Sequence, residues 1–137
     1  MNYELGRKLV AAATSRAKAD YGRPICVAVC DQFGFLTAFV RMDDAPVRSI
    51  EIAQGKAYTS ARLGVDTDAF LERLQTNNIP ASYFCDDKLT GLQGGCVLKG
   101  ASGKVIGGLG ISGLTPEEDM QIARSLVALA SAANAQI

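Results

Sequence analysis

Residues 25–40 decide the fold, and they read Ile-Cys-Val-Ala-Val-Cys-Asp-Gln-Phe-Gly-Phe-Leu-Thr-Ala-Phe-Val. Two apolar runs of strand length, 25–30 and 35–40, flank a tight turn at 31–34. Strands joined by so short a turn must be antiparallel, since a parallel return needs a crossover of about a dozen residues or more. The first run is continuously apolar rather than alternating, which predicts a strand covered on both faces. We therefore expect an antiparallel hairpin buried between layers.

Helical spacing of apolar residues predicts the elements on either side of this hairpin. The last helix has the clearest start, because Thr115-Pro-Glu-Glu118 forms a capping box with proline at the first helical position. In strand 105–112, the face made by Ile106, Gly108, Gly110 and Ser112 lacks bulk, which lets another group approach the backbone. The expected order is a helix over 2–21, the hairpin, a helix after 43–46, a short helix from 66, an irregular stretch over 77–90, a second hairpin over 94–112 and the final helix.

Local pairing of strands, with helices before, between and after the hairpins, predicts an α/β protein of the α+β type. We expect one domain over residues 1–137, with an antiparallel sheet of four or five strands in an α/β/α arrangement. The length suits a single domain with its own core.

The helix after Pro46 is apolar on two sides. Ile50, Ala53 and Ala57 form its core stripe, but Ile52, Thr59 and Leu63 fall nearly opposite at 100° per residue. A helix apolar on both sides is usually covered on both sides. We predict that a second subunit or a ligand covers the outer face, and that Ile52, Thr59 and Leu63 lie in an oligomer interface.

Composition excludes several classes of function. The chain has no histidine, so no Ser-His-Asp, Cys-His or histidine-containing zinc site can exist. Fourteen basic and fourteen acidic residues balance, which argues against a nucleic-acid partner. No apolar run reaches the length of a membrane span, and the start shows no export signal, so we expect a cytoplasmic protein without a membrane partner.

The four cysteines show no CxxC spacing. Cys26 and Cys30 lie on one strand roughly 13 Å apart, too far to form a disulfide or hold one metal together. We read all four as reduced thiols and predict no metal site.

Three features are candidates for binding. Residues 111–115 run into the last helix and could seat an anion, unless the capping box already occupies the free amides. Arg41 with Asp43 precedes Lys56 and could hold a carboxylate, or it could fix the turn from strand to helix. Gly94-Gly95 permits a tight turn or a close ligand approach.

The sequence offers few candidate catalytic residues. A nucleophile or base could come only from Cys96, next to the paired glycines, or from Lys56. Nothing nearby in the sequence would lower the pKa of the thiol. We therefore predict no catalytic residues.

The same features resemble the GlcG/HbpS family, which includes the C-terminal domain of PduO-type proteins. The resemblance spans roughly residues 5–130. It rests on Val27-Ala-Val-Cys-Asp31, Gly34, Arg41-Met-Asp43, Ser49-Ile50, Lys56-Ala57, Gly94-Gly95, residues 103–113 and Asp119.

This resemblance implies a profilin-like α/β/α sandwich around a five-stranded antiparallel sheet, assembled into homo-oligomers from dimer to octamer. It also implies a binding role, because some members bind haem, and an association with glycolate or diol and glycerol utilisation. The chain departs from the pattern at Cys96-Val97, where members often have proline. It also lacks the histidine that some members use as an axial ligand, so haem would need Cys, Met, Tyr or Thr instead.

The leading hypothesis is a non-catalytic, oligomeric binding protein for a small organic ligand or a tetrapyrrole, haem or a corrinoid. Its ligand would lie near Arg41, Asp43, Lys56, Gly94 and Gly95. The alternatives are an accessory enzyme acting on a small hydroxy acid, diol or aldehyde, and a structural subunit that binds another protein.

Overall fold

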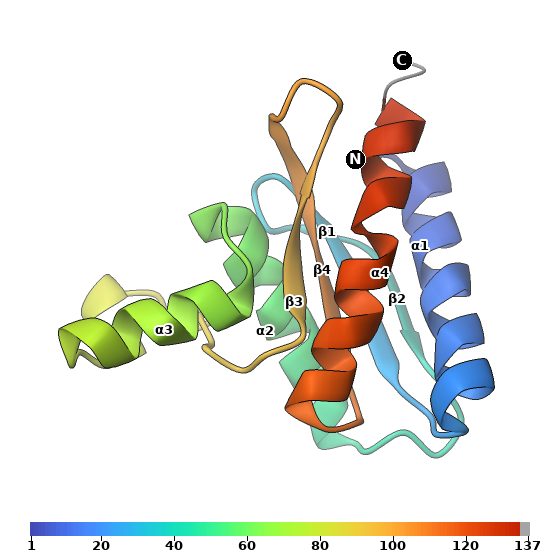
Figure 1. Ribbon diagram of the computed structural model, residues 1–137, viewed down its shortest axis with the longest axis horizontal. Helices are drawn as coiled ribbons and strands as arrows, with labels where there is room; N and C mark the ends of the chain where they lie inside the picture. The colour runs from blue at the N-terminus through green and yellow to red at the C-terminus, as the bar shows by residue number, and fades with distance from the viewer. Residues whose placement is uncertain (135–137) are drawn as a thin grey trace.

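The computed structural model describes residues 1–134, and the predicted hairpin is present, with its first strand inside the sheet and its second strand at the edge (Figure 1). Strands β1 (Cys26–Asp31) and β2 (Leu36–Arg41) pair antiparallel. The turn between them is tied by Asp31, whose Oδ1 accepts hydrogen bonds from the amides of Phe33 at 2.9 Å and Phe35 at 3.0 Å. The aspartate therefore closes the loop by bonding its own backbone, as Asx turns do.

The second hairpin joins β3 (Gly95–Lys99) to β4 (Val105–Ser112), and β4 pairs with β1. The resulting sheet is antiparallel throughout, in the order β2-β1-β4-β3. Among the described residues it has four strands, so the five strands implied by the family resemblance were wrong. Residues 78–94, which lie before β3, fold as a 3-10 turn and irregular segments instead. In one of these segments the amide of Thr90 donates to Oγ1 of Thr59 on a helix, so this amide is not available to a strand.

Helices cover both faces of the sheet, as the α/β/α prediction required. Helix α1 (Tyr3–Arg16), with its π-helical continuation η1 (Ala17–Tyr21), packs with α4 (Pro116–Asn134) on one face. Helix α2 (Arg48–Leu63) packs on the other face against the β1 side chains Cys26, Ala28 and Cys30. The alternate residues Val27 and Val29 point to the α1–α4 side, so β1 is buried on both faces.

The bare face of β4 lets α2 come unusually close. A Cβ on Gly108 would lie 2.2 Å from the carbonyl oxygen of Ala57, and one on Gly110 would lie 2.0 Å from that of Ala53. No real side chain tolerates such distances. The group that approaches this face is therefore the backbone of α2. The absence of side chains at these glycines allows helix and sheet to pack closely.

A less compact part of the chain leaves the sandwich after α2. Helix α3 (Thr67–Asn77) and the 3-10 turn η2 (Ala81–Phe84) project sideways from the three layers (Figure 1). The chain then returns through residues 85–93, which we call the strap, and crosses over α2 before entering β3. The strap includes part of the stretch predicted to be irregular.

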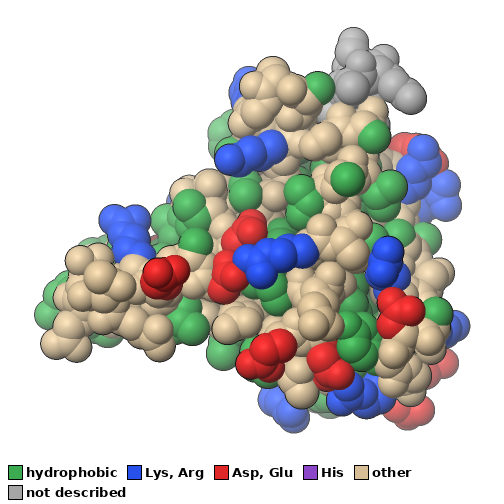
Figure 2. Space-filling model, viewed as in Figure 1, with side chains coloured by type: hydrophobic (Ala, Val, Ile, Leu, Met, Phe, Trp, Pro, Cys, Tyr) green, Lys and Arg blue, Asp and Glu red, His purple; other side chains and the backbone are tan. Residues whose placement is uncertain are grey.

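Charges on the surface are mixed. Figure 2 shows basic and acidic side chains interspersed over the face that carries α4 and β3, with no continuous field of one sign. On α4, Arg124 pairs with Asp66 at 3.7 Å and also with Asp68. Across residues 1–134, none of the helices combines the length and apolar character needed to cross a membrane.

Candidate functional site

Three of the five predicted ligand residues meet inside the protein. Lys56, on α2, has a side chain that is only 3% exposed, and its Nζ donates to the carbonyl oxygen of Ile111 at 2.7 Å. The same Nζ lies 3.1 Å from Oδ2 of Asp119 on α4. Oδ1 of Asp119 accepts a hydrogen bond from the amide of Leu114 at 3.1 Å. Both charged groups are thus satisfied by protein atoms.

The paired glycines are required by this cluster. A Cβ on Gly94, whose φ is +123°, would lie 2.6 Å from the carbonyl oxygen of Ile111 and 2.7 Å from Nζ of Lys56. A Cβ on Gly95 would lie 2.5 Å from a methyl carbon of Thr67 and 2.6 Å from the carbonyl oxygen of Lys56. The close approach predicted for these glycines is therefore made by their own chain.

Burial dominates the electrostatics of the pair. Desolvation lowers the pKa of Lys56 and raises the pKa of Asp119, while each charge partly offsets the shift of the other. The arrangement ties α2 to α4 through the sheet. A direct ligand-binding role for Lys56, Gly94 and Gly95 stays a prediction, because protein atoms fill their surroundings here.

The other two predicted residues lie apart from the cluster. Nε and Nη2 of Arg41 donate to the carbonyl oxygen of Ala45 at 3.1 and 2.9 Å, which braces the turn from β2 to α2. Asp43 is exposed. Both residues line a small depression at the end of β2, together with Met42 and Asp44.

The predicted anion seat before α4 is filled by the capping box. The amide of Glu118 donates to Oγ1 of Thr115 at 3.2 Å, and the amide of Thr115 donates to Oε1 of Glu118 at 3.1 Å. The carboxylate also pairs with Arg23 at 2.6 Å. Of the two readings left open for this segment, the helix cap is the one observed.

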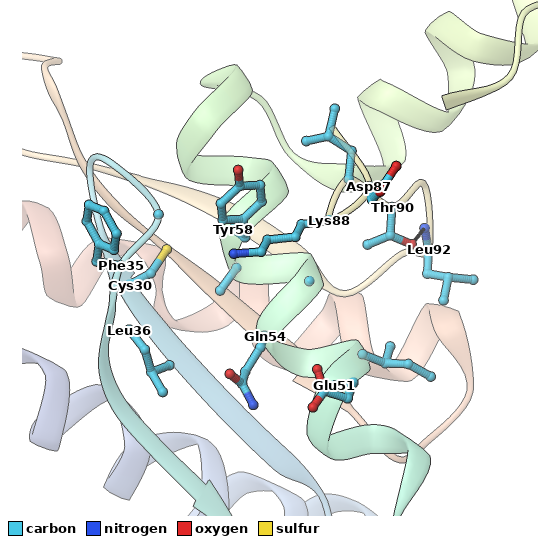
Figure 3. Close-up of a pocket in the computed structure, with 15 residues that line it drawn as sticks. Cys30, Phe35, Leu36, Glu51, Gln54, Tyr58, Asp87, Lys88, Thr90 and Leu92 are labelled. Carbon is cyan, nitrogen blue, oxygen red and sulfur yellow. Dashed lines mark hydrogen bonds between the residues drawn. The ribbon is translucent and has the colours of Figure 1, made fainter. Parts of the chain in front are cut away.

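A groove of about 580 Å³ lies on the outer side of α2, and none of the five predicted ligand-binding residues lines it (Figure 3). Its size falls within the range of small-molecule sites. One wall is the β1–β2 hairpin, with Phe35 and Leu36, and the opposite wall is the strap, with Leu92. The floor is α2, including Ile52 and Tyr58. Phe35, Leu36 and Leu92 are 70, 50 and 48% exposed, so the walls offer apolar surface to a ligand.

The strap is bonded to α2 at two points. The amide of Thr90 donates to Oγ1 of Thr59 at 2.9 Å, and the hydroxyl of Tyr58 donates to Oδ2 of Asp86 at 2.6 Å. Between these points the strap packs against Gly55, where a Cβ would make an ordinary contact 3.5 Å from the carbonyl oxygen of Lys88. The groove is therefore a built feature of the fold.

The strap also revises the predicted oligomer interface. Thr59 is completely buried under its own strap, so it presents no surface to a second subunit. Ile52 is partly exposed in the groove, and Leu63 is partly exposed near the end of α2. The outer face of α2 is thus covered in part by the chain itself, an option that a helix taken alone does not reveal.

The two ends of the groove differ in charge. At one end the ring of Tyr58 has the guanidinium of Arg62 at 5.1 Å and the ammonium of Lys88 at 5.4 Å from its centroid. Glu51 lies seven residues before Tyr58 on α2, about 10 Å along the helix axis. Cys30 also lines the groove, and burial raises the pKa of its thiol to about 12.

Sequence reasoning missed this groove because the strap has no period. One signal points to it in retrospect. Thr59 is a polar residue on an otherwise apolar face, where its hydroxyl needs a partner.

The fold and groove define a class of protein: a small α+β domain with an antiparallel sheet between helices and an apolar groove suited to a small ligand. The chain matches the family described as haem degrading protein HbpS-like over residues 1–128. It belongs to this HbpS-like family, as its sequence motifs indicated.

Curated relatives support the same assignment. The chain is 35% identical over 124 residues to the corrinoid adenosyltransferase PduO of Salmonella typhimurium, which covers 88% of this chain and 36% of PduO. It spans little more than a third of the two PduO relatives that it matches. It is 31% identical over 112 residues to protein GlcG of Escherichia coli, covering 82% of this chain and 81% of GlcG.

Solved structures share the architecture. The PduOC:heme complex superposes with a TM-score of 0.83 at 31% identity, covering 94% of both chains. A double mutant of HbpS from Streptomyces reticuli superposes with a TM-score of 0.84 at 28% identity, covering 94% of this chain and 86% of the other.

Proposed function

We propose that this chain is a non-catalytic, cytoplasmic binding protein for a small organic ligand, with a tetrapyrrole, haem or a corrinoid, as the ligand. The groove over α2 carries the proposal, because it combines a suitable volume with apolar walls and a few polar groups. A similar structure is named as a heme complex, and a relative is named as a corrinoid adenosyltransferase, which supports this ligand class. A role in glycolate or diol and glycerol use belongs to the same proposal.

The groove can hold the ring of a tetrapyrrole by apolar contact, but within residues 1–134 it offers no strong axial ligand for the metal at the centre of the ring. The thiol of Cys30 has a pKa of about 12, so the thiolate that iron prefers is scarce. The hydroxyl of Tyr58 donates to Asp86, and this hydrogen bond, together with burial, raises the pKa of Tyr58. The sequence has no histidine. The donors present therefore do not fit strong axial ligation, and the ring would be held by apolar contact and by its acidic side groups.

Titration with haemin and with a corrinoid tests the ligand class. We expect a saturable change in absorbance with at least one of them. Ile52→Trp, which fills the groove from its floor, should weaken binding by about tenfold or more. Leu129→Trp, on the exposed side of α4, is the matched control and should bind as the unmodified protein does. Binding that is absent, or equal in both variants, would contradict the proposal.

Burial argues against the enzymatic alternative. Cys96 is completely buried, and desolvation raises the pKa of its thiol to about 12. Lys56 is held in the buried pair with Asp119. Neither group is poised to attack a substrate from solvent. The third alternative, a structural subunit for another protein, predicts copurification of that partner without a retained small molecule.

The proposal includes assembly into a homo-oligomer, through a face that contains Ile52 and Leu63. Leu63 is the sharper test, since it does not line the groove. Leu63→Glu should reduce the mass measured by light scattering while the circular dichroism spectrum stays native. An unchanged mass for both Leu63→Glu and Ile52→Glu would remove this interface.

A further inference from the structure

The geometry points to a ligand class for the groove: an apolar molecule that carries a carboxylate at the Tyr58 end, selected by Lys88. This inference rests on the proposed function, because it concerns the same groove. It names Lys88, which lines the groove, as the residue that determines specificity.

Lys88 lies on the strap and reaches across the groove toward Tyr58 (Figure 3). Its Nζ is 5.4 Å from the centroid of the Tyr58 ring. The ring is itself fixed, because its hydroxyl donates to Asp86 at 2.6 Å. A cation over an immobilised aromatic ring is held in place without being neutralised.

Two carboxylates, those of Asp86 and Asp87, lie close to Lys88 in sequence, and neither forms an ion pair with it within 4.0 Å. The hydrogen bond from Tyr58 and, to a smaller extent, the charge of Lys88 lower the pKa of Asp86. Asp86 is occupied by the hydroxyl of Tyr58 and by the amide of Lys88, which donates to its Oδ1 at 3.1 Å. Among residues 1–134, the ion pairs within 4.0 Å include neither Nζ of Lys88 nor the guanidinium of Arg62. Arg62 instead donates to the carbonyl oxygen of Phe33 at 3.1 Å. Within residues 1–134, Lys88 therefore brings an ammonium that forms no ion pair within 4.0 Å to one end of the groove, whose lining also includes Asp87.

The rest of the groove sets the orientation of the ligand. The apolar side chains of Phe35, Leu36 and Leu92 favour an apolar body between the walls. Glu51, at the other end of the floor, repels a second anionic group there. The complementary ligand thus has its carboxylates gathered on one side, as a tetrapyrrole with propionate groups does. A long-chain or aromatic monocarboxylic acid shares this chemistry.

Paired porphyrins separate recognition of the acid from recognition of the ring. Binding of protoporphyrin IX and of its dimethyl ester is measured by porphyrin fluorescence, since the protein has no tryptophan whose quenching could report binding. We expect the free acid to bind about fivefold more tightly, a modest factor because Lys88 is exposed and water screens its charge. Lys88→Met should bind both forms alike, and Lys88→Arg should keep the preference. Lys104→Met, an exposed lysine outside the groove lining, is the matched control.

Salt provides a readout that a purely structural role for Lys88 would not change. The preference for the free acid should fall as ionic strength rises from about 0.05 to 0.5 M, since salt screens exposed charges. Equal binding of acid and ester by the unmodified protein would overturn the inference and leave the proposed function standing. So would a preference that survives in Lys88→Met.

Absence of binding by either porphyrin would instead contradict the tetrapyrrole proposal. Binding of a fluorescent long-chain fatty acid and of its methyl ester then tests whether Lys88 selects a carboxylate when no porphyrin is involved. The inference stands if the acid binds more tightly and Lys88→Met abolishes the difference. It fails if acid and ester behave alike or neither binds.

Discussion

The buried pair of Lys56 and Asp119 offers the sharpest test of the structure. Lys56→Met keeps an unbranched side chain of similar length but removes the ammonium. It leaves the carboxylate of Asp119, whose side chain is 4% exposed, without its cation, and the carbonyl oxygen of Ile111 without its donor. Removing one partner of a buried pair costs about 3–5 kcal/mol. Against a total stability of about 5–15 kcal/mol, that loss is severe.

Urea unfolding followed by circular dichroism measures the loss at a fixed protein concentration, so that any oligomer contributes equally. A cost of about 4 kcal/mol with a slope of about 2 kcal/mol per molar lowers the midpoint by about 2 M. The double variant Lys56→Met with Asp119→Leu removes both charges together. It should recover to within about 2 kcal/mol of the unmodified protein, because desolvation of the pair offsets most of its attraction. The amide of Leu114, which loses its acceptor, accounts for part of the remaining deficit.

The pH dependence of Lys56→Met has a definite sign. Burial raises the pKa of Asp119 in the folded protein, and loss of the neighbouring cation raises it further. A carboxyl whose pKa is higher in the folded state binds protons preferentially when folded, so stability increases as pH falls through that range. The deficit of Lys56→Met should shrink between pH 7 and pH 5. A well-folded Lys56→Met within 1 kcal/mol of the unmodified protein at pH 7 would refute the buried ion pair.

Three further predictions concern packing, thiol exposure and the strap. Gly110→Ala places a Cβ 2.0 Å from a carbonyl oxygen of α2, so it should lower the free energy of unfolding by more than about 3 kcal/mol or prevent folding. Gly55→Ala makes only ordinary contacts, so it should be neutral or stabilising by up to about 1 kcal/mol. Urea unfolding measures both. A thiol reagent should label one cysteine, Cys85, in the folded protein, because the other three are buried; rapid labelling of a second would contradict their burial. Thr59→Val removes the acceptor that holds the strap and should cost about 1–3 kcal/mol while amide exchange rises in residues 86–92; unchanged exchange there would show that the strap is held otherwise.

Much of the fold follows from patterns that are local in the chain. The tight turn at 31–34 dictated an antiparallel hairpin, and the capping box at 115–118 started the last helix where predicted. The bare face of β4 correctly predicted a close approach to its backbone. The number of strands did not follow, because a family resemblance extends to architecture and not to each local pairing. Residues 77–90 show no clean period, and their conformation depends on what they pack against.

The candidate site was predictable only in part. Lys56 and the paired glycines do come together, but the sequence did not show that they face inward, or that Asp119 completes the cluster. Arg41 serves its own loop, which was one of the two alternatives. The groove escaped prediction because its walls come from β1–β2, α2 and the strap, which are distant in sequence. Proximity of that kind depends on tertiary packing.

Composition alone excludes two kinds of chemistry. A chain with no histidine cannot form a histidine-dependent triad and cannot ligate haem through imidazole. The sequence by itself also determined the hairpins, the main helices and the family, because these rest on short-range periodicity, turns and ordered motifs. The tertiary structure alone decided which face of α2 stays open, that Thr59 is covered, and that Lys88 stands unpaired over Tyr58. The physical reason is that burial and charge pairing depend on neighbours brought together by folding, and the strap that supplies those neighbours carries no local pattern of its own.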